Sequence, residues 1–433
     1  MRMVITQVGR NSYMFQVTRK RIGEHRHHPH GGWSSPKTVL SGIMALVSVT
    51  CEAPVNIALI KYWGKRDEEK ILPLNPSLSI TLDMADLRTK TTVVASKYFD
   101  RDRLWLNGKE QDIHSKRLQV CITKLRQGAD DLWLDGKLVV AKKDWIDYRL
   151  HIISENNFPT AAGLASSASG LACFVYSIAQ LLQFKETFPG ELTTIARQGS
   201  GSSCRSLLGG FVMWESGSAE DGSDSIAKQV APVDSWNSLR VVILIVNEQQ
   251  KKTSSTAGMQ TSVETSELLK FRAREVVPLQ LSRMLNAVKE TDFATLATVT
   301  MQESNQFHAC CLDTFPPIFY LNDVSKEIIH FVHEYNACRA DTVVAYTFDA
   351  GPNAVLLTKE ENLEDLMTCL YKRFGFFPVT GKKLPDFVCE TPPGHQIIRS
   401  IVTRIGEGPR VITRSLDNED SLATKEGMPK LIS

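Results

Sequence analysis

The sequence predicts an α+β protein with two domains. Its 433 residues exceed the roughly 250–300 residues that a single hydrophobic core usually serves, so a second domain and a ligand-binding cleft between the two are expected. Strand-like runs dominate the first third of the chain, and helical spacing mixes with strands after it. Regular strand–helix–strand units are few, which favours α+β over a doubly wound parallel sheet.

In the first half, β-branched and apolar runs predict short strands, and the Asn107-Gly108 pair after one of them is typical of a hairpin turn. Strands are expected at residues 47–50, 55–62, 77–82, 91–94, 104–106, 150–153 and 211–214. Apolar residues at i, i+3 and i+4 spacing predict a helix after the Gly/Ser-rich loop 159–169 and a shorter one over 192–197.

In the second half, the continuous apolar run at 239–246 predicts a buried strand. Helical spacing then extends from 266 to 306. Two more strands, 343–348 and 354–358, are expected around the tight turn Gly351-Pro352-Asn353.

The domain boundaries are predicted after residues 43 and 235. Residues 1–43 carry a basic run and four clustered histidines with weak periodicity, so we expect a flexible extension and a folded unit that begins near Met44. The first domain then spans 44–235 and the second 236–433. A mitochondrial transit peptide fits the extension only loosely, and the histidines at 25–30 leave open a metal-binding regulatory arm.

Composition and charge exclude several classes of protein. A formal net charge of +2 gives no basis for a nucleic-acid surface, and no apolar run is long enough to insert into a membrane. The nine cysteines include no C-x-x-C pair, which favours reduced thiols in the cytoplasm over a disulfide frame or a zinc site.

The strongest local motif is the loop at 156–170, which reads NNFPTAAGLASSASG. Small residues allow close approach of the backbone to a ligand, and the helix N-terminus that follows attracts phosphate. Ser166 and Ser167 can add hydroxyl donors or offer oxygens to Mg²⁺. The alternative is a Ser-capped helix whose small residues serve packing alone.

Three further segments combine polar groups with glycine or apolar strands. The cluster GSGSSCRS at 199–206 suits a bound anion, because Arg205 can grip a carboxylate or phosphate with two parallel hydrogen bonds. Lys61 interrupts an apolar strand, so it either extends outward or faces a polar cleft. Asp349 ends a strand before the Gly-Pro turn. The plain alternatives are a surface arginine in a loop, an outward lysine and a turn-forming aspartate.

Together these segments resemble the mevalonate diphosphate decarboxylase (diphosphomevalonate decarboxylase) family of the GHMP kinase superfamily. The resemblance runs in order over roughly residues 47–415 and is carried by the motifs APVNIALIKYWGKR, NNFPTAAGLASSASG, RQGSGSSCRSLLGGFV, SNQFHACCLDTFPPI and YTFDAGPNAV. Ser169 and Ser203 stand where relatives usually carry alanine, and the extension before Met44 has no counterpart.

The resemblance implies the two-domain GHMP kinase fold. Its N-terminal domain would resemble ribosomal protein S5 domain 2, with an unusual left-handed βαβ unit. Its C-terminal domain would be ferredoxin-like and carry the catalytic aspartate, and the protein would be a homodimer.

Roles at the active site follow from the resemblance, residue by residue. Asp349 matches the catalytic aspartate beside the substrate's C3 hydroxyl, and Lys61 matches the lysine that contacts it. Asn56 and Arg205 match residues that hold the substrate carboxylate. The positions near the substrate diphosphate are Tyr62, Ser200 and Ser202.

The resemblance also implies the nucleotide site. Ser167 matches the loop serine near the ATP phosphates and is the candidate ligand of Mg²⁺. The turn at Asn107 lies where the family binds the nucleotide. The remaining cofactor-binding residues belong to the loop: Ala162, Gly163, Leu164, Ala165 and Ser166.

The function implied is ATP-dependent decarboxylation of mevalonate 5-diphosphate to isopentenyl diphosphate, in the mevalonate pathway of isoprenoid and sterol biosynthesis. A GHMP-type small-molecule kinase that transfers phosphate without releasing CO₂ is the nearest alternative. A non-catalytic binding protein on the same fold is a second, although it would require loss of a catalytic group, and Asp349, Lys61, Ser167 and Arg205 are all present.

Overall fold

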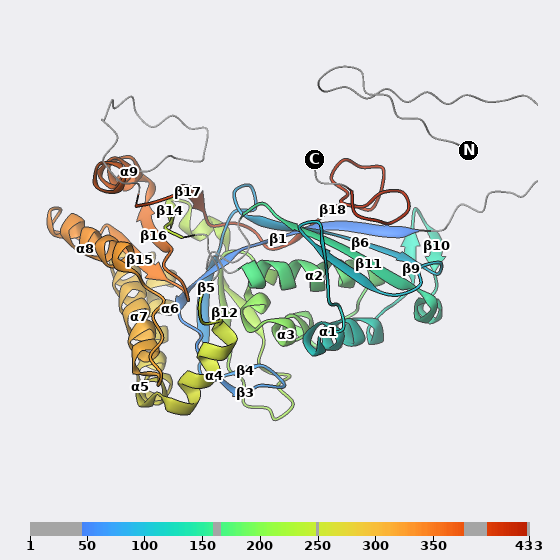
Figure 1. The fold of residues 1–433 in the computed structure, drawn as a ribbon, viewed down its shortest axis with the longest axis horizontal. Coiled ribbons are helices and arrows are strands. Elements are labelled where there is room, and N and C mark those ends of the chain that lie inside the picture. The colour runs from blue at the N-terminus through green and yellow to red at the C-terminus, as the bar shows by residue number, and fades with distance from the viewer. Residues whose placement is uncertain (1–45, 159–165, 248–250, 376–395, 431–433) are drawn as a thin grey trace, which may run out of the picture. The chain divides into compact units, whose positions relative to one another are not determined.

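The computed structural model describes residues 46–158, 166–247, 251–375 and 396–430, all of which lie within the unit Met44–Ser433 (Figure 1). The predicted extension 1–43 with its histidines lies outside the described residues. So do Ala162, Gly163, Leu164 and Ala165 of the predicted phosphate loop.

A six-stranded sheet in the order β18-β1-β6-β11-β7-β8 forms the first layer. Its strands are β1 (Val47–Pro54), β6 (Arg88–Ser96), β7 (Arg103–Leu106), β8 (Lys109–Gln111), β11 (Arg149–Asn156) and β18 (Arg410–Thr413). Three helices pack beside this sheet and share its apolar core: α1 (Lys116–Gln127), α2 (Ser166–Leu182) and α3 (Glu191–Gly199). β7 runs parallel to β11, whereas the other pairings are antiparallel.

A second, four-stranded sheet in the order β13-β12-β5-β2 lies in the middle of the unit. Its strands are β2 (Asn56–Ile60), β5 (Ser77–Thr81), β12 (Phe211–Trp214) and β13 (Ala227–Ala231). The 3-10 turn Gly201–Leu207 adjoins it. A short hairpin of β3 (Lys65–Asp67) and β4 (Leu72–Pro73) contacts α4. Every residue of β2 and β5 is buried; β2 (NIALI) is mostly apolar, whereas β5 (SLSIT) alternates hydroxyl and apolar side chains.

A third sheet has the order β15-β16-β14-β17 and is covered by helices. Its strands are β14 (Leu239–Ile245), β15 (Val344–Phe348), β16 (Ala354–Lys359) and β17 (Arg399–Arg404). The helices of this half are α4 (Ser255–Thr265), α5 (Glu267–Phe271), α6 (Val277–Glu290), α7 (Phe293–Asp313), α8 (Asp323–Ala337) and α9 (Glu360–Phe374).

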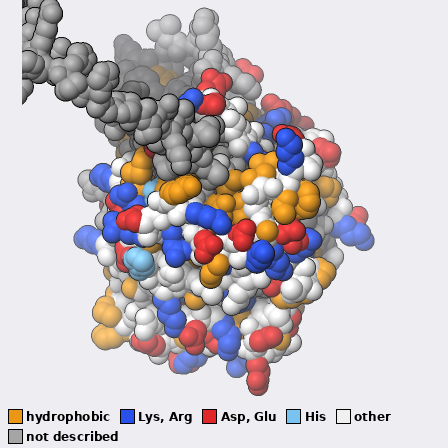
Figure 2. Space-filling view, turned by 90° about the vertical axis from the view of Figure 1, so that its right-hand side faces the viewer, with side chains coloured by type: hydrophobic (Ala, Val, Ile, Leu, Met, Phe, Trp, Pro, Cys, Tyr) orange, Lys and Arg blue, Asp and Glu red, His pale blue; other side chains and the backbone are white. Residues whose placement is uncertain are grey.

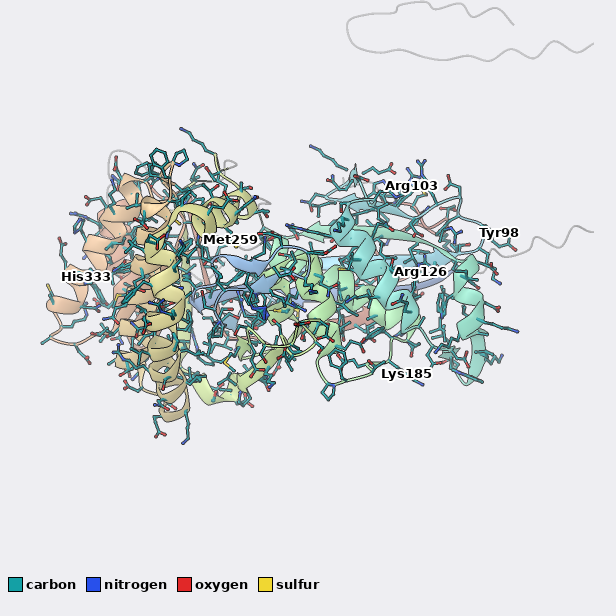
Figure 3. All side chains as sticks on the ribbon, turned by 90° about the horizontal axis from the view of Figure 1, so that it is seen from below. Tyr98, Arg103, Arg126, Lys185, Met259 and His333 are labelled. Carbon is teal, nitrogen blue, oxygen red and sulfur yellow. The ribbon has the colours of Figure 1, made fainter. Side chains whose placement is uncertain are left out.

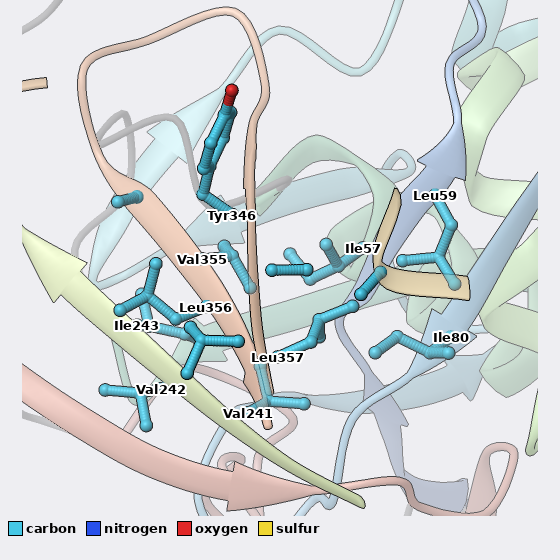
Figure 4. Packing of buried hydrophobic residues seen from close by; sticks show 14 of the residues in the cluster. Ile57, Leu59, Ile80, Val241, Val242, Ile243, Tyr346, Val355, Leu356 and Leu357 are labelled. Carbon is cyan, nitrogen blue, oxygen red and sulfur yellow. The ribbon is translucent and has the colours of Figure 1, made fainter. Parts of the chain in front are cut away.

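One apolar core joins the second and third sheets. Figure 4 shows Ile57, Leu59 and Ile80 of the middle sheet in the same cluster as Val241 and Leu357 of the third. This shared core includes residues of β2 and β15, the strands that directly precede the residues described below, and α7 contacts both strands.

Most predicted strands are confirmed, with shifts of a few residues at their ends. The strand expected over 55–62 is wrong at its end, because β2 stops at Ile60 and the Lys61 N–H donates to the Glu303 carboxylate instead of a neighbouring strand. Several elements were not predicted, among them α1, α8, α9, β17, β18 and the hairpin of β9 (Leu132–Leu134) and β10 (Lys137–Val140).

The ends of the chain complicate a simple division into halves. β18 pairs with β1, and Leu416 and Leu422 pack against a small core on the first sheet. The boundary between residues 235 and 236 stays a prediction.

The surface is mixed in charge on the face shown in Figure 2, where Lys and Arg side chains are interspersed with Asp and Glu. In the part of the chain that is described, no helix is both long and apolar enough to cross a membrane.

Candidate active site

A cavity of about 480 Å³ opens between the middle sheet, α2 and α4. Figure 3 labels Met259, one of its lining residues, on α4. The cavity brings together residues predicted from separate motifs: Asn56, Lys61, Tyr62, Ser167, Ser200, Ser202, Arg205 and Asp349.

Lys61 and Asp349 meet directly in this cavity. Lys61 Nζ donates to Asp349 Oδ1 over 2.6 Å, although the two residues are 288 positions apart in sequence. Burial lowers the pKa of Lys61, and the Asp349 charge opposes that shift. The Asp349 side chain remains 28% exposed toward the cavity, against 3% for Lys61, so the carboxylate is the member of the pair that a bound molecule can reach.

His308 lies close enough to feel both charges of the pair. Burial lowers its pKa to about 3, and the charge of Lys61 adds to the shift. The imidazole is therefore neutral at physiological pH, so His308 does not compete with Lys61 as a positively charged partner of Asp349.

Arg205 is a second buried cation that lines the cavity; we call its surroundings the Arg205 wall and those of Lys61 and Asp349 the Lys61 wall. Its Nε donates to Asn56 Oδ1 over 3.3 Å and its Nη1 to Ser77 Oγ over 2.6 Å. Asn56 is fixed in turn, because its Nδ2 donates to Ser206 Oγ and to the Ser202 carbonyl. Within the described ranges, Arg205 forms no ion pair, although the charge of Asp349 acts on it from across the cavity, and its hydrogen bonds go to neutral side chains.

Tyr62, Ser200 and Ser202 line the same side of the cavity as Arg205. The Tyr62 ring packs edge-on against Trp214 at 4.6 Å, and its buried hydroxyl has no partner among the described residues. Gly201 allows this approach, because a Cβ there would lie 3.0 Å from the Tyr62 hydroxyl oxygen.

Ser167 lies in the first turn of α2 and lines the cavity with an exposed side chain. Ser166 begins the same helix. Asn107 does not line this cavity: it occupies the β7–β8 turn with a positive φ of 47°, and its side chain accepts the Asn156 N–H. Its predicted contact with a nucleotide stays a prediction.

Two family models cover most of the chain. Residues 53–227 match the diphosphomevalonate decarboxylase-like N-terminal domain, and residues 241–412 match the mevalonate 5-diphosphate decarboxylase C-terminal domain. The chain is also 47% identical over 402 residues to the human diphosphomevalonate decarboxylase, covering 89% of this chain and 98% of that protein. The chain belongs to the diphosphomevalonate decarboxylase family.

Solved structures of the family share the fold. A crystal structure of mevalonate 5-diphosphate decarboxylase, 44% identical, superposes with a TM-score of 0.76 and covers 87% of this chain and 99% of that chain. A structure described as MDDEF in complex with MVAPP, AMPPCP and magnesium is 32% identical, with a TM-score of 0.66 over 85% of this chain and 99% of that chain. The predicted α+β, two-domain GHMP kinase fold is confirmed, while the handedness of the βαβ unit stays a prediction.

The two serines expected to stand where relatives carry alanine, Ser169 and Ser203, are both buried and bonded. Ser169 Oγ lies 2.8 Å from Thr89 Oγ1, and Ser203 Oγ donates to the Ala196 and Ser200 carbonyls. Each hydroxyl has an acceptor where it lies, so these decarboxylase-family positions accept serine without an orphaned polar group.

Sequence reasoning missed several polar residues of this family site. Lys65, Arg117 and Lys251 line the cavity, together with Ser254 and the first residues of α4. Lys251 Nζ donates to Ser255 Oγ and to the Ala350 carbonyl, and burial lowers the pKa of Lys251. Basic residues of this kind are the signal for a polyanionic ligand, but these are scattered over β3, α1 and the segment before α4.

The donor set also fits a magnesium–nucleotide complex. Across the described residues, no group of three or more His, Cys, Asp or Glu side chains could enclose a metal ion. Mg²⁺ usually keeps several waters and is held through one or two protein oxygens together with substrate phosphates. Asp349 and Ser167 supply such oxygens within one cavity.

Proposed function

We propose that this chain catalyses the ATP-dependent decarboxylation of mevalonate 5-diphosphate to isopentenyl diphosphate, ADP, phosphate and CO₂. Family membership supports the reaction, and the observation that carries it is the cavity in which Asp349 and Arg205 face the same space. One group suits an alcohol and the other a carboxylate, and the substrate carries both.

The Asp349 carboxylate would orient the C3 hydroxyl and accept its proton during phosphoryl transfer. This transfer is largely dissociative, so the proton can leave late and a carboxylate is a sufficient base. Lys61 would hold Asp349 in place through the 2.6 Å ion pair. The phosphorylated oxygen is then a good leaving group at a tertiary carbon.

Arg205 would hold the substrate's C1 carboxylate together with Asn56. Departure of the C3 phosphate leaves positive charge at that carbon, and loss of CO₂ supplies the electrons of the new double bond. Since CO₂ is neutral, the ion pair with Arg205 weakens along this step. Arg205 therefore acts mainly by positioning, which can supply several kcal/mol.

The remaining polar groups would bind phosphates. Tyr62, Ser200 and Ser202 are assigned to the substrate diphosphate, and Ser167 with the loop before it to ATP. Bound Mg²⁺ would neutralise phosphate charge, with Ser167 as a protein ligand. Lys251 and Ser254 extend this phosphate-binding surface beyond the predicted set.

We also assign a homodimeric state and a cytoplasmic location to the chain. The first is tested by sedimentation equilibrium, and the second by imaging the tagged full-length protein in cells.

The reaction is tested by incubating the purified chain with mevalonate 5-diphosphate, ATP and Mg²⁺ and counting ADP and labelled CO₂ together. Equal amounts of both products are expected. Release of ADP without CO₂ would instead identify a kinase, and absence of both would leave only a binding protein.

A further inference from the structure

The main chain of Lys61 is hydrogen-bonded by charged side chains to which the reaction assigns no role. The Lys61 N–H donates to Glu303 Oε2 over 3.1 Å. The Lys61 carbonyl accepts from Asn75 Nδ2 over 3.1 Å and from Arg272 Nη2 over 3.4 Å. Both main-chain polar groups of this one residue are thus bound by side chains from distant parts of the chain.

These side chains are also bonded to each other. Arg272 and Glu303 form a close ion pair whose side chains are 2% and 0% exposed. Arg272 Nη1 lies 3.4 Å from Asn75 Oδ1, which closes the network around the Lys61 peptide groups. Arg272, Glu303 and Asn75 do not line the cavity, so the network lies behind Lys61 and does not touch a bound substrate.

Stability alone is a weak reason for such a pair. Replacing a buried ion pair by apolar residues of similar size is often neutral or stabilising, because both charges lose their hydration. Arg272 also begins a π-helical turn, Arg272–Val276, between α5 and α6. π-Turns inside helices are rare and occur frequently at functional sites.

We propose that the Arg272–Glu303 pair, with Asn75, is a positioning device for Lys61, which fixes its main chain so that the ammonium group meets Asp349. This inference rests on the proposed roles of Lys61 and Asp349. Lys61 has a long, flexible side chain, and an anchored backbone at one end and an ion pair at the other leave it little freedom. Misplacement of a catalytic group by about 1 Å can cost roughly 10²-fold in rate.

Glu303 has a second, electrostatic effect on the same residue. Burial lowers the pKa of Lys61, and the charge of Glu303 partly reverses that shift. The charged or titratable groups around Lys61 come from four elements: Asp349 after β15, Glu303 and His308 on α7, Arg205 in the 3-10 turn and Arg272 in the π-turn. Among them, Asp349 and Glu303 favour the protonated lysine.

The test is Glu303→Gln in the full-length chain. The amide keeps the size of the side chain but removes the charge, so Lys61 should lose its proton at a lower pH. We expect kcat to fall by about 10–100-fold, with KM for mevalonate 5-diphosphate nearly unchanged and the alkaline limb of the kcat profile moved to lower pH. An unchanged kcat and pH profile in a folded Glu303→Gln protein would overturn the proposal.

A matched control is Glu52→Gln on β1. Glu52 is also a buried carboxylate, paired with Arg88 at 2.7 Å and Arg410 at 3.0 Å, but it does not line the cavity. This variant should lose stability without any change in the pH profile. A profile shifted equally in both variants would show a general effect of instability and would overturn the positioning role.

Glu303→Gln leaves Arg272 without its ion-pair partner and can prevent folding. In that case Arg272→Met together with Glu303→Leu removes both charges and keeps the volume. The same loss of kcat is expected, and wild-type turnover in this folded double variant would contradict the proposal.

A measurement without turnover separates this inference from the proposed function. NMR of protein with isotope-labelled lysine side chains, with the Lys61 signal assigned by its loss in Lys61→Arg, reports the pKa of Lys61 without a reagent that must reach the buried amine. A lower pKa in Glu303→Gln supports the electrostatic part even if the wild-type chain releases no CO₂, whereas an unchanged pKa removes that part even if the wild type is fully active.

Discussion

Two buried cations face the same cavity but are balanced in different ways. Lys61 is paired with the Asp349 carboxylate at 2.6 Å. Arg205 is just as buried, yet its guanidinium is bonded to the neutral side chains of Asn56 and Ser77. The Asp349 charge acts on Arg205 as well, but only Lys61 forms a direct ion pair with it. Burying a charge without a direct ion pair is costly, so an anionic ligand stabilises Arg205 more than Lys61. We therefore assign the chemical step to the Lys61 wall, with Asp349, and anion binding to the Arg205 wall.

Asp349→Asn should produce the largest effect, because it removes both the proton acceptor and the ion pair with Lys61. We expect kcat to fall by at least about 10²–10⁴-fold, the range typical of a general base. Single-turnover formation of ADP and labelled CO₂ measures the loss. Asp83→Asn is the control, since Asp83 forms a 2.9 Å ion pair with Arg404 outside the cavity. Wild-type turnover in Asp349→Asn would remove this carboxylate from its role.

Arg205→Lys tests whether the second wall needs geometry or only charge. Lysine keeps the charge but loses the planar fork that can bind a carboxylate through two hydrogen bonds. We expect kcat/KM for mevalonate 5-diphosphate to fall by roughly 10²-fold.

The control for this variant is Arg197→Lys. Arg197 is also buried, but it donates to the main-chain carbonyls of Lys70 and Gly222 and does not line the cavity. It should lose thermal stability and keep substrate affinity. If Arg205→Lys is fully active, charge alone suffices at that wall.

The pH dependence of kcat should report the protonation state of Lys61. Burial lowers the pKa of Lys61 from its ordinary value of 10.5, so rising pH neutralises this lysine before an exposed one. Activity should then decline by about tenfold per pH unit above that lowered pKa. Lys61→Arg should remove this limb, since arginine stays charged. A limb that survives in Lys61→Arg belongs to another group.

Tyr62→Phe should have the smallest effect, on the anion-binding wall. The variant removes a buried hydroxyl that has no partner among the described residues. The free energy of unfolding should therefore rise by up to about 1 kcal/mol. Loss of a hydrogen bond to the substrate diphosphate should raise KM roughly fivefold. Tyr320→Phe is the control, because its buried hydroxyl is also unpartnered within the described residues but does not line the cavity. Equal KM values in the two variants would exclude Tyr62 from diphosphate binding.

The sequence predicted the individual strands better than the arrangement of the site. Lys61 in an apolar run and Asp349 before a Gly-Pro turn were each ambiguous, and their meeting across 288 positions was expected only through the family resemblance. Pairing over such a distance depends on the shared core of the middle and third sheets, which no local pattern reports.

Some omissions had a readable signal and others had none. Helix α8 was missed although Ile328, Phe331, Val332 and Tyr335 follow helical spacing and are all buried. Lys251 lies in a polar run without periodicity, and its approach to the cavity depends on α4 and the Ala350 carbonyl. The Arg272–Glu303 pair joins two helices, and its contact with Lys61 requires three separate segments to be placed in space.

The pairing of β18 with β1 has a consequence for biosynthesis. Arg410 and Glu52 contact each other across 358 positions, so the edge of the first sheet is completed only after nearly all of the second half has left the ribosome. Until then one edge of β1 is unpaired, and strands of other nascent chains can pair with it. Folding in the cell should therefore depend on chaperones that shield this edge during translation.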